Sequence, residues 1–197
     1  MLVVAANVPS TALWPWFMVA PLLCLAALKM TVPSWRALPI WLRFGGFDLR
    51  LAAWTALVSV LTVSMLCLWF AHKTAGLSPA ILRTPIFAHE PILLAGLGFA
   101  LLNSVMEEVI CRGFLYDGLT AHFGWKLGLI GQAAIFGVMH KNGIPSGIAG
   151  MILATFFGLA TGLLRRAEGG LLGCVITHWA ADFTIFLMVD RELRHTN

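Results

Sequence analysis

Charged residues are scarce in this sequence. Only 11% of its 197 residues are Asp, Glu, Lys or Arg, while 59% are hydrophobic and the mean hydropathy is +0.87. Soluble domains contain about 25% charged residues, so this composition excludes an ordinary soluble domain. It indicates a protein whose surface faces the hydrocarbon interior of a lipid bilayer.

Several motifs of metal, redox and nucleotide sites are missing from the sequence. It contains no CxxC pair, no HExxH motif and no Gly-rich phosphate-binding loop. The net charge is +4, but the basic residues stand singly or in pairs at the ends of hydrophobic segments. This placement favours contact with lipid head groups, so we expect no nucleic-acid partner. The four cysteines are too scattered for a zinc or redox pair: Cys24, Cys67, Cys111 and Cys174.

Long hydrophobic segments take the place of these motifs. A helix needs about 20 apolar residues to cross a hydrocarbon core of about 30 Å. We therefore predict an all-α fold, a polytopic transmembrane helical bundle of about six spans, as a single transmembrane domain over residues 1–197. Residues 1–28 lack Lys and Arg, so we expect a retained first span and not a cleaved signal. The six segments are residues 11–30, 51–71, 91–120, 125–141, 146–164 and 171–189.

The distribution of Lys and Arg predicts the orientation in the membrane, because loops rich in them tend to stay cytoplasmic. With the N-terminus outside, the inside loops hold eight of these residues and the outside holds five. Both termini are therefore expected outside, and the margin narrows if Arg112 lies within a span. The inside group is Lys29, Arg36, Arg43, Arg50, Arg112, Lys126, Arg165 and Arg166, and the outside group is Lys73, Arg83, Lys141, Arg191 and Arg194.

Small residues recur at every fourth position of the fifth segment. They are Ser146, Gly150, Ala154, Gly158 and Gly162. This spacing places them in one stripe along a helix, where a second backbone can approach closely. We expect the stripe to pack against another helix of the same bundle.

Ionisable residues interrupt the third hydrophobic segment. Glu107, Glu108 and Arg112 lie in its interior, where a charged side chain costs about 2.5–3.5 kcal/mol to insert, so they are candidate functional residues. Glu108 and Arg112 are four residues apart and should form an ion pair on one helix face. Glu107 points about 100° away. We therefore expect Glu108 and Arg112 to have a structural, orienting role, and Glu107 to be the candidate base.

Histidines lie in the fourth and sixth segments. His140 ends the fourth, and the sixth contains His178 and Asp182 at i,i+4 spacing. A turn near residues 121–124 would place Glu107 and His140 at similar depths, about 21 and 24 Å from it. A lone helical histidine is more often structural, but two histidines, an Asp and a Glu pair in one bundle favour a common site.

These three segments resemble the CPBP family, the CAAX protease and bacteriocin-processing intramembrane proteases. The family's motifs are EExxxR, FxxxH and HxxxN or HxxxD. Here they read Glu107 through Arg112, Phe136 through His140, and His178 through Asp182. The resemblance covers a catalytic core of about residues 91–189. The last motif ends in Asp182, where the prenyl-protein endopeptidases of the family carry Asn.

The resemblance implies a glutamic-type intramembrane endopeptidase. Glu107 and His140 would activate a water that attacks a peptide carbonyl, while His178 and Asp182 support the developing oxyanion. A neutral His178 could donate to it, whereas an ionised Asp182 could not. The expected partner is a membrane-associated protein or peptide, with no cofactor. The short chain favours a bacterial form, and hence the inner (cell) membrane, whereas substrate and oligomeric state stay open.

The residues alone leave other chemistries open. A zinc-dependent protease could use Glu107, His140 and His178 as metal ligands. A transporter or proton relay also places buried acids and histidines along its pathway. A third alternative is an inactive relative that binds a peptide, as an immunity protein would. Ser104 and Cys111 are conceivable nucleophiles, although the sequence assigns neither of them a base.

Overall fold

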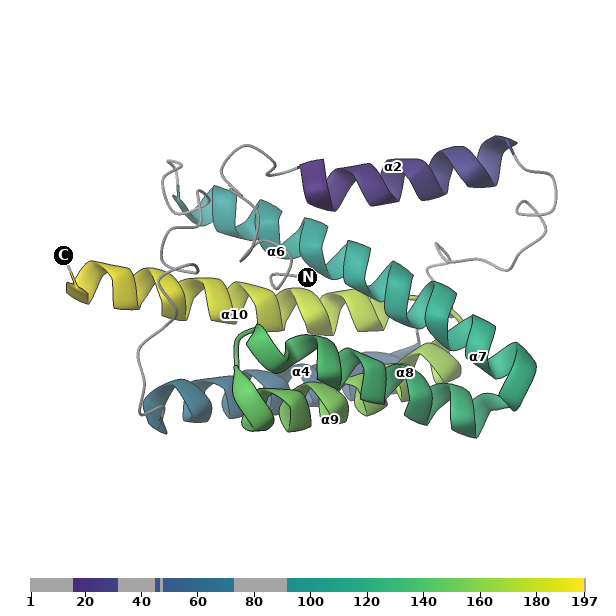
Figure 1. The fold of residues 1–197 in the computed structure, drawn as a ribbon. Coiled ribbons are helices and arrows are strands. Elements are labelled where there is room, and N and C mark those ends of the chain that lie inside the picture. The colour runs from purple at the N-terminus through teal and green to yellow at the C-terminus, as the bar shows by residue number, and fades with distance from the viewer. Residues whose placement is uncertain (1–15, 32–44, 47, 73–91, 197) are drawn as a thin grey trace.

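The computed structural model describes residues 16–31, 45–46, 48–72 and 92–196, and in these ranges the chain is helical, without strands (Figure 1). A single continuous helix combines α6, the π-helix η3 and α7. The 3₁₀-helix η4 follows α8. The elements are α2 (Trp16–Thr31), α4 (Leu49–His72), α6 (Ile92–Glu108), η3 (Val109–Leu115), α7 (Tyr116–Phe123), α8 (Trp125–Met139), η4 (His140–Asn142), α9 (Gly147–Glu168) and α10 (Leu172–Thr196).

Each of the six predicted hydrophobic segments contains a helix, which confirms the all-α membrane bundle. Within the described residues, four helices are long and apolar enough to cross a membrane: residues 49–72, 92–123, 147–168 and 172–194. The remaining two, α2 and α8, have 16 and 15 residues. They are shorter than the roughly 20 residues of a full span, so the number of spans is approximate.

Helix α10 lies at the centre of the bundle, in contact with α4, α6 and α9, while α2 lies along the outer side of α6 (Figure 1). The small-residue stripe packs α9 against α8, as predicted. A Cβ atom on Gly158 would lie 3.0 Å from the Cα of Ala133. A larger side chain would therefore separate the two helices, which hold His140 and one wall of the site described below.

Basic residues gather at one end of the bundle. The backbone N–H of Gly46 donates to the carbonyl of Glu168, which places the start of α4 beside the end of α9. The Trp125 ring lies 4.2 Å from the guanidinium of Arg166, which places the start of α8 there as well. Of the residues assigned to the inside, Arg50, Lys126, Arg165 and Arg166 thus share this end. Arg112 lies within a helix, and Arg36 and Arg43 lie outside the described residues.

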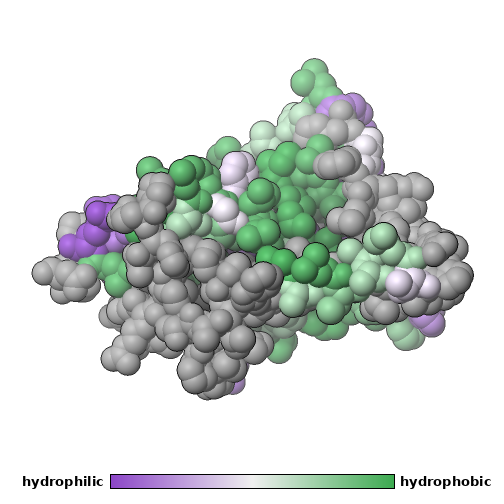
Figure 2. All heavy atoms as spheres, turned by 90° about the horizontal axis from the view of Figure 1, so that it is seen from above, coloured by the Kyte–Doolittle hydropathy of each residue, from purple (hydrophilic) through white to green (hydrophobic). Residues whose placement is uncertain are grey.

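The surface of the described residues is largely apolar. Hydrophobic side chains cover much of the face seen in Figure 2, and hydrophilic residues gather toward its ends. On α4, for example, Leu57, Leu61 and Leu68 are exposed by 56%, 56% and 54%. Such a surface suits contact with lipid chains, in agreement with the hydropathy of the sequence.

Candidate active site

The two glutamates end helix α6, directly before the π-helix η3. Glu107 is 5% exposed, and Glu108 and Arg112 are fully buried. Within η3 the backbone N–H of Tyr116 donates to the carbonyl of Cys111, five residues earlier. Short π-helical turns occur often at functional sites, because they change the direction of the side chains that follow.

The carboxylate of Glu108 connects two helices. Its Oε1 accepts a hydrogen bond of 2.8 Å from Nη1 of Arg112 and one of 2.6 Å from Nδ1 of His178 on α10. The guanidinium of Arg112 also lies over the Phe136 ring of α8, at 4.3 Å from its centroid. One buried ion pair therefore links the three helices that carry the motifs, α6, α8 and α10.

The other ring nitrogen of His178 faces two further carboxylates. Its Nε2 lies 3.7 Å from Oε2 of Glu107 and 3.6 Å from Oδ1 of Asp182. The ring is also packed edge-on against Phe136 and Phe157, with centroid distances of 5.9 and 5.2 Å. Because Nδ1–H donates to Glu108, the tautomer and the orientation of the ring are both constrained.

His140 approaches the same site from α8. It begins η4, and its Nδ1 donates to the carbonyl of Phe136 at 2.8 Å, which leaves Nε2 available for a proton or a substrate. Its ring packs on Phe136 with a centroid distance of 4.4 Å. The His178 ring packs on the same phenylalanine, with its centroid 5.9 Å away. The structure thus brings the four residues Glu107, His140, His178 and Asp182 together.

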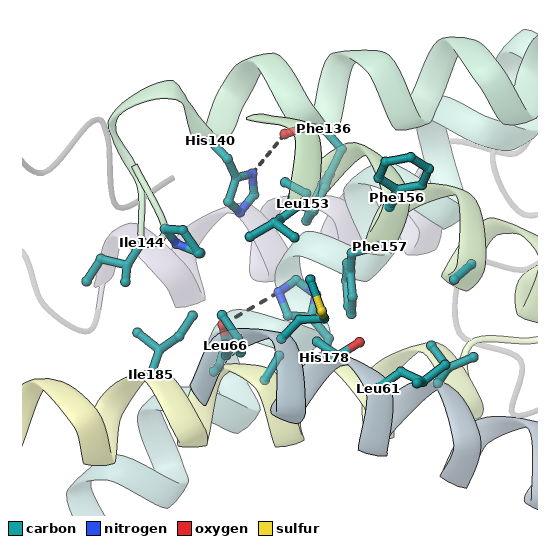
Figure 3. A pocket seen from close by; sticks show the side chains of 18 residues that line it. Leu61, Leu66, Phe136, His140, Ile144, Leu153, Phe156, Phe157, His178 and Ile185 are labelled. Carbon is teal, nitrogen blue, oxygen red and sulfur yellow. Dashed lines mark hydrogen bonds and ion pairs between the residues drawn. The ribbon is translucent and has the colours of Figure 1, made fainter. Parts of the chain in front are cut away.

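A cavity of about 320 Å³ opens from this cluster (Figure 3). His140, His178 and Asp182 line its polar part, and most of the remaining lining is apolar side chains of α4, α8, α9, α10 and the loop after η4. Glu107 does not line the cavity. Its Oε2 lies 3.7 Å from Nε2 of His178, which does. The lining residues Leu61, Met65 and Phe156 are exposed, which places the mouth between α4 and α9 on the apolar surface.

The possible metal ligands do not converge on one point. Within the described part of the chain, no group of three or more His, Cys, Asp or Glu side chains is arranged to hold a metal ion. Both His178 nitrogens face carboxylates, and Nδ1 of His140 is bonded to a backbone carbonyl.

Ser104, the conceivable serine nucleophile, donates its hydroxyl hydrogen to the carbonyl of Leu101, which gives the hydroxyl a local structural partner.

Sequence reasoning missed two buried polar residues near the site. Asn103 is 3% exposed and donates from Nδ2 to Oδ2 of Asp182 at 2.9 Å. Arg165 of α9 is 7% exposed and donates from Nε to the backbone carbonyl of Arg112 at 3.1 Å. The signal for Asn103 is its position, four residues before Glu107 on the same helix face. Arg165 gave no such signal, because its position in the sequence is that of an ordinary basic residue at the end of a span.

Arg165 supports the π-helix that contains Arg112. In an α-helix the Arg112 carbonyl would accept from Tyr116, but that N–H donates to Cys111. Arg165 supplies a donor instead, and its Nη2 forms an ion pair of 2.9 Å with Asp117. The guanidinium thus stabilises both the irregular turn and the helix after it.

Replacing Arg165 with glutamine is expected to lower the free energy of unfolding by about 1–3 kcal/mol, since a buried acceptor loses its donor. The measurement is denaturant unfolding of the purified protein in detergent micelles. The neighbouring Arg166→Gln variant is a matched control, because it removes the same charge from an exposed side chain over Trp125. Equal losses in both variants would show that charge, and not the bond to Arg112, matters.

The comparison with known families fits this geometry. Residues 89–184 match the family described as type II CAAX prenyl endopeptidase Rce1-like. This region is Rce1-like. It covers nearly the range of the CPBP resemblance and contains all six candidate site residues, which lie between Glu107 and Asp182. No curated protein and no solved structure is similar enough to the chain to count as a match.

The Rce1-like region supplies helices α6 to α9 and the first half of α10. It therefore contains both the π-helix and every charged contact of the site. Helices α2 and α4 lie outside it, although α4 provides one wall of the cavity. The family implies a peptidase, and the apolar helices make it an integral membrane protein.

Proposed function

We propose that this protein is an intramembrane endopeptidase in which Glu107 and His140 activate the attacking water. One observation carries the proposal: Glu107, His178 and Asp182 meet within 3.7 Å beside a cavity that opens on the apolar surface. An isolated structural ion pair has no need of such a cavity. The Rce1-like match supports the same reaction class.

The buried carboxylate of Glu107 is the general base of the proposed mechanism. It accepts a proton as the water oxygen attacks the carbonyl carbon of the peptide bond. His140 takes this proton from Glu107 at its free Nε2 and passes it to the leaving amine nitrogen as the C–N bond breaks. Glu108 takes no part in proton transfer, because it is bonded to Arg112 and His178.

His178 stabilises the developing oxyanion in this proposal. Its Nδ1–H is bound to Glu108, so His178 donates from Nε2 when its ring carries both protons, and this second hydrogen points toward Glu107, Asp182 and the cavity. An unprotonated Nε2 would instead direct its lone pair at the carboxylate oxygens of Glu107 and Asp182, which would repel it. A donor directed at an oxyanion in an apolar site is worth about 3–4 kcal/mol. Asp182 keeps the ring in place and need not donate.

The expected substrate is a protein or peptide associated with the membrane. The cavity walls are almost wholly apolar, and its mouth lies between α4 and α9 at the lipid-facing surface. An apolar segment can therefore reach the site without first entering water. The proposal places the protein in a bacterial cell membrane, and the four long apolar helices among the described residues support the membrane location.

Cleavage in cells tests the proposal before a substrate is identified. The gene is deleted in the native host and restored, and new protein N-termini in the membrane fraction are labelled and identified by mass spectrometry. We expect N-termini that require the restored gene and lie within or next to hydrophobic segments. Their absence would contradict an endopeptidase, and ion flux in proteoliposomes would then favour the transporter.

Metal removal distinguishes the glutamic from the zinc-dependent mechanism. The proposed mechanism needs no metal, so treatment of the purified protein with a strong chelator is expected to leave its cleavage rate unchanged within about twofold. Metal analysis of the same sample is expected to find far less than one zinc per chain. Stoichiometric zinc, with activity lost to the chelator and restored by zinc, would instead establish the zinc-dependent enzyme.

A further inference from the structure

Asn103 is a buried amide that the mechanism above does not use. It lies on α6, one helical turn before Glu107, and it is 3% exposed. Its Nδ2 donates to Oδ2 of Asp182 on α10 at 2.9 Å. A buried amide is kept in place only when its polar atoms have partners, and this one points at the site.

The environment of Asp182 explains what such a donor can do. Its Oδ1 lies 3.6 Å from Nε2 of His178, while its Oδ2 accepts from Asn103. On the other side of the same nitrogen, Oε2 of Glu107 lies at 3.7 Å. Two carboxylates this close to one ring nitrogen repel each other strongly in an apolar interior, unless donors lie between them.

The amide of Asn103 has two hydrogens and contacts both carboxylates. One hydrogen is directed to Asp182. The side chain of Asn103 also interacts with Glu107 on its own helix. A primary amide is suited to this place, since it donates twice without adding charge.

We propose that Asn103 is a positioning residue of the active site, whose amide holds the Asp182 carboxylate with Oδ1 toward His178 and apart from Glu107. This inference rests on the proposed function. Asn103 touches no substrate and acts through Asp182.

The pair can be tested by exchanging its two side chains. Asn103→Leu removes the donor, and Asn103→Asp places a carboxylate against Asp182. Both are expected to reduce the yield of gene-dependent N-termini about 100-fold, as expected when a catalytic group is misplaced by about 1 Å. The double variant Asn103→Asp with Asp182→Asn restores one amide and one carboxylate with the bond reversed, and its amide oxygen can face His178. Because the new carboxylate at position 103 still lies beside Glu107, we expect a partial recovery, to about tenfold above the yield of Asn103→Asp.

The readouts separate positioning from folding. Ser104→Ala is the matched control, since Ser104 is equally buried on α6 but bonds only to Leu101. It should keep wild-type cleavage, and all variants should keep wild-type protein levels in the membrane. Asn103→Leu with full activity, or an exchange no better than Asn103→Asp, would overturn this inference while wild-type cleavage upholds the proposed function. A wild type that yields no N-termini would contradict both.

Discussion

Replacing Glu107 with glutamine is expected to abolish cleavage, with a fall in rate of at least about 1,000-fold. Glutamine has nearly the shape of glutamate but cannot accept the proton from water, and general base catalysis contributes about 10²–10⁴ in rate. The amide can still contact His178, so the fold should survive. The measurement is the rate at which gene-dependent N-termini accumulate after the variant is induced.

A matched acid elsewhere controls for the loss of charge. Glu192 lies near the end of α10, away from the cluster of Glu107, His178 and Asp182. Glu192→Gln should cleave at the wild-type rate. Unfolding in detergent should show that both variants are folded, as the wild type is. A Glu107→Gln variant that inserts normally and still cleaves at more than a tenth of the wild-type rate would exclude Glu107 as the base.

Replacing Arg112 with methionine is expected to cause the largest loss of stability, about 3–5 kcal/mol. Methionine fills a similar volume, but it leaves the carboxylate of Glu108 buried without its cation. It also removes the contact of the guanidinium with Phe136. Cleavage should be lost as well, because Glu108 orients His178. Denaturant unfolding and protein yield from the membrane measure the first effect.

Two comparisons show whether this loss comes from the uncompensated charge. Arg194→Met breaks an i,i+4 pair with Asp190 whose arginine is 62% exposed, and it should change stability by less than about 1 kcal/mol. Glu108→Leu combined with Arg112→Met removes both charges but also the acceptor of the His178 Nδ1–H, so it should regain part of the lost stability without activity. In the described structure Oε2 of Glu108 and two guanidinium nitrogens have no hydrogen-bond partner, so an apolar pair is a fair replacement. A double variant as unstable as Arg112→Met would contradict this explanation.

The helices, the ion pair of Glu108 with Arg112 and the close packing of α9 could be predicted from the sequence, because they depend on local patterns. Hydrophobic runs indicated the long α-helices among the described residues, and the four-residue spacing of Glu108 and Arg112 indicated their ion pair. The small-residue stripe predicted that α9 packs closely against another helix of the bundle, and the structure shows that this helix is α8. Each of these features is fixed by residues a few positions apart.

The rest of the site depends on contacts between distant segments. His178 forms its 2.6 Å hydrogen bond with Glu108 because α10 crosses α6 at this point. The i,i+4 spacing in the sequence indicated only Asp182 as its neighbour. The π-helix depends on Arg165, which lies 53 residues after Arg112 in the chain. The cavity owes one wall to α4, outside the Rce1-like region. A single sequence contains no periodic signal for such pairings.

The three motifs therefore predicted which residues meet, but not how they share protons. The sequence left the role of Asp182 open, and the contacts of its two oxygens now support an orienting role. One oxygen faces His178, and the other accepts from Asn103. The pairing of Glu108 with both Arg112 and His178 supports its assignment as an orienting residue, in agreement with the proposal that Glu107 and His140 transfer the proton.

The most direct test of the peptidase assignment uses purified protein in lipid nanodiscs and a synthetic peptide that spans a cleavage site found in cells. The two products are followed by mass spectrometry over time, with the Glu107→Gln variant in parallel. We predict that the wild type cuts the peptide at the cellular site in the presence of a chelator, and that the variant does not. Equal cleavage by both proteins, or none by the folded wild type, would contradict the account.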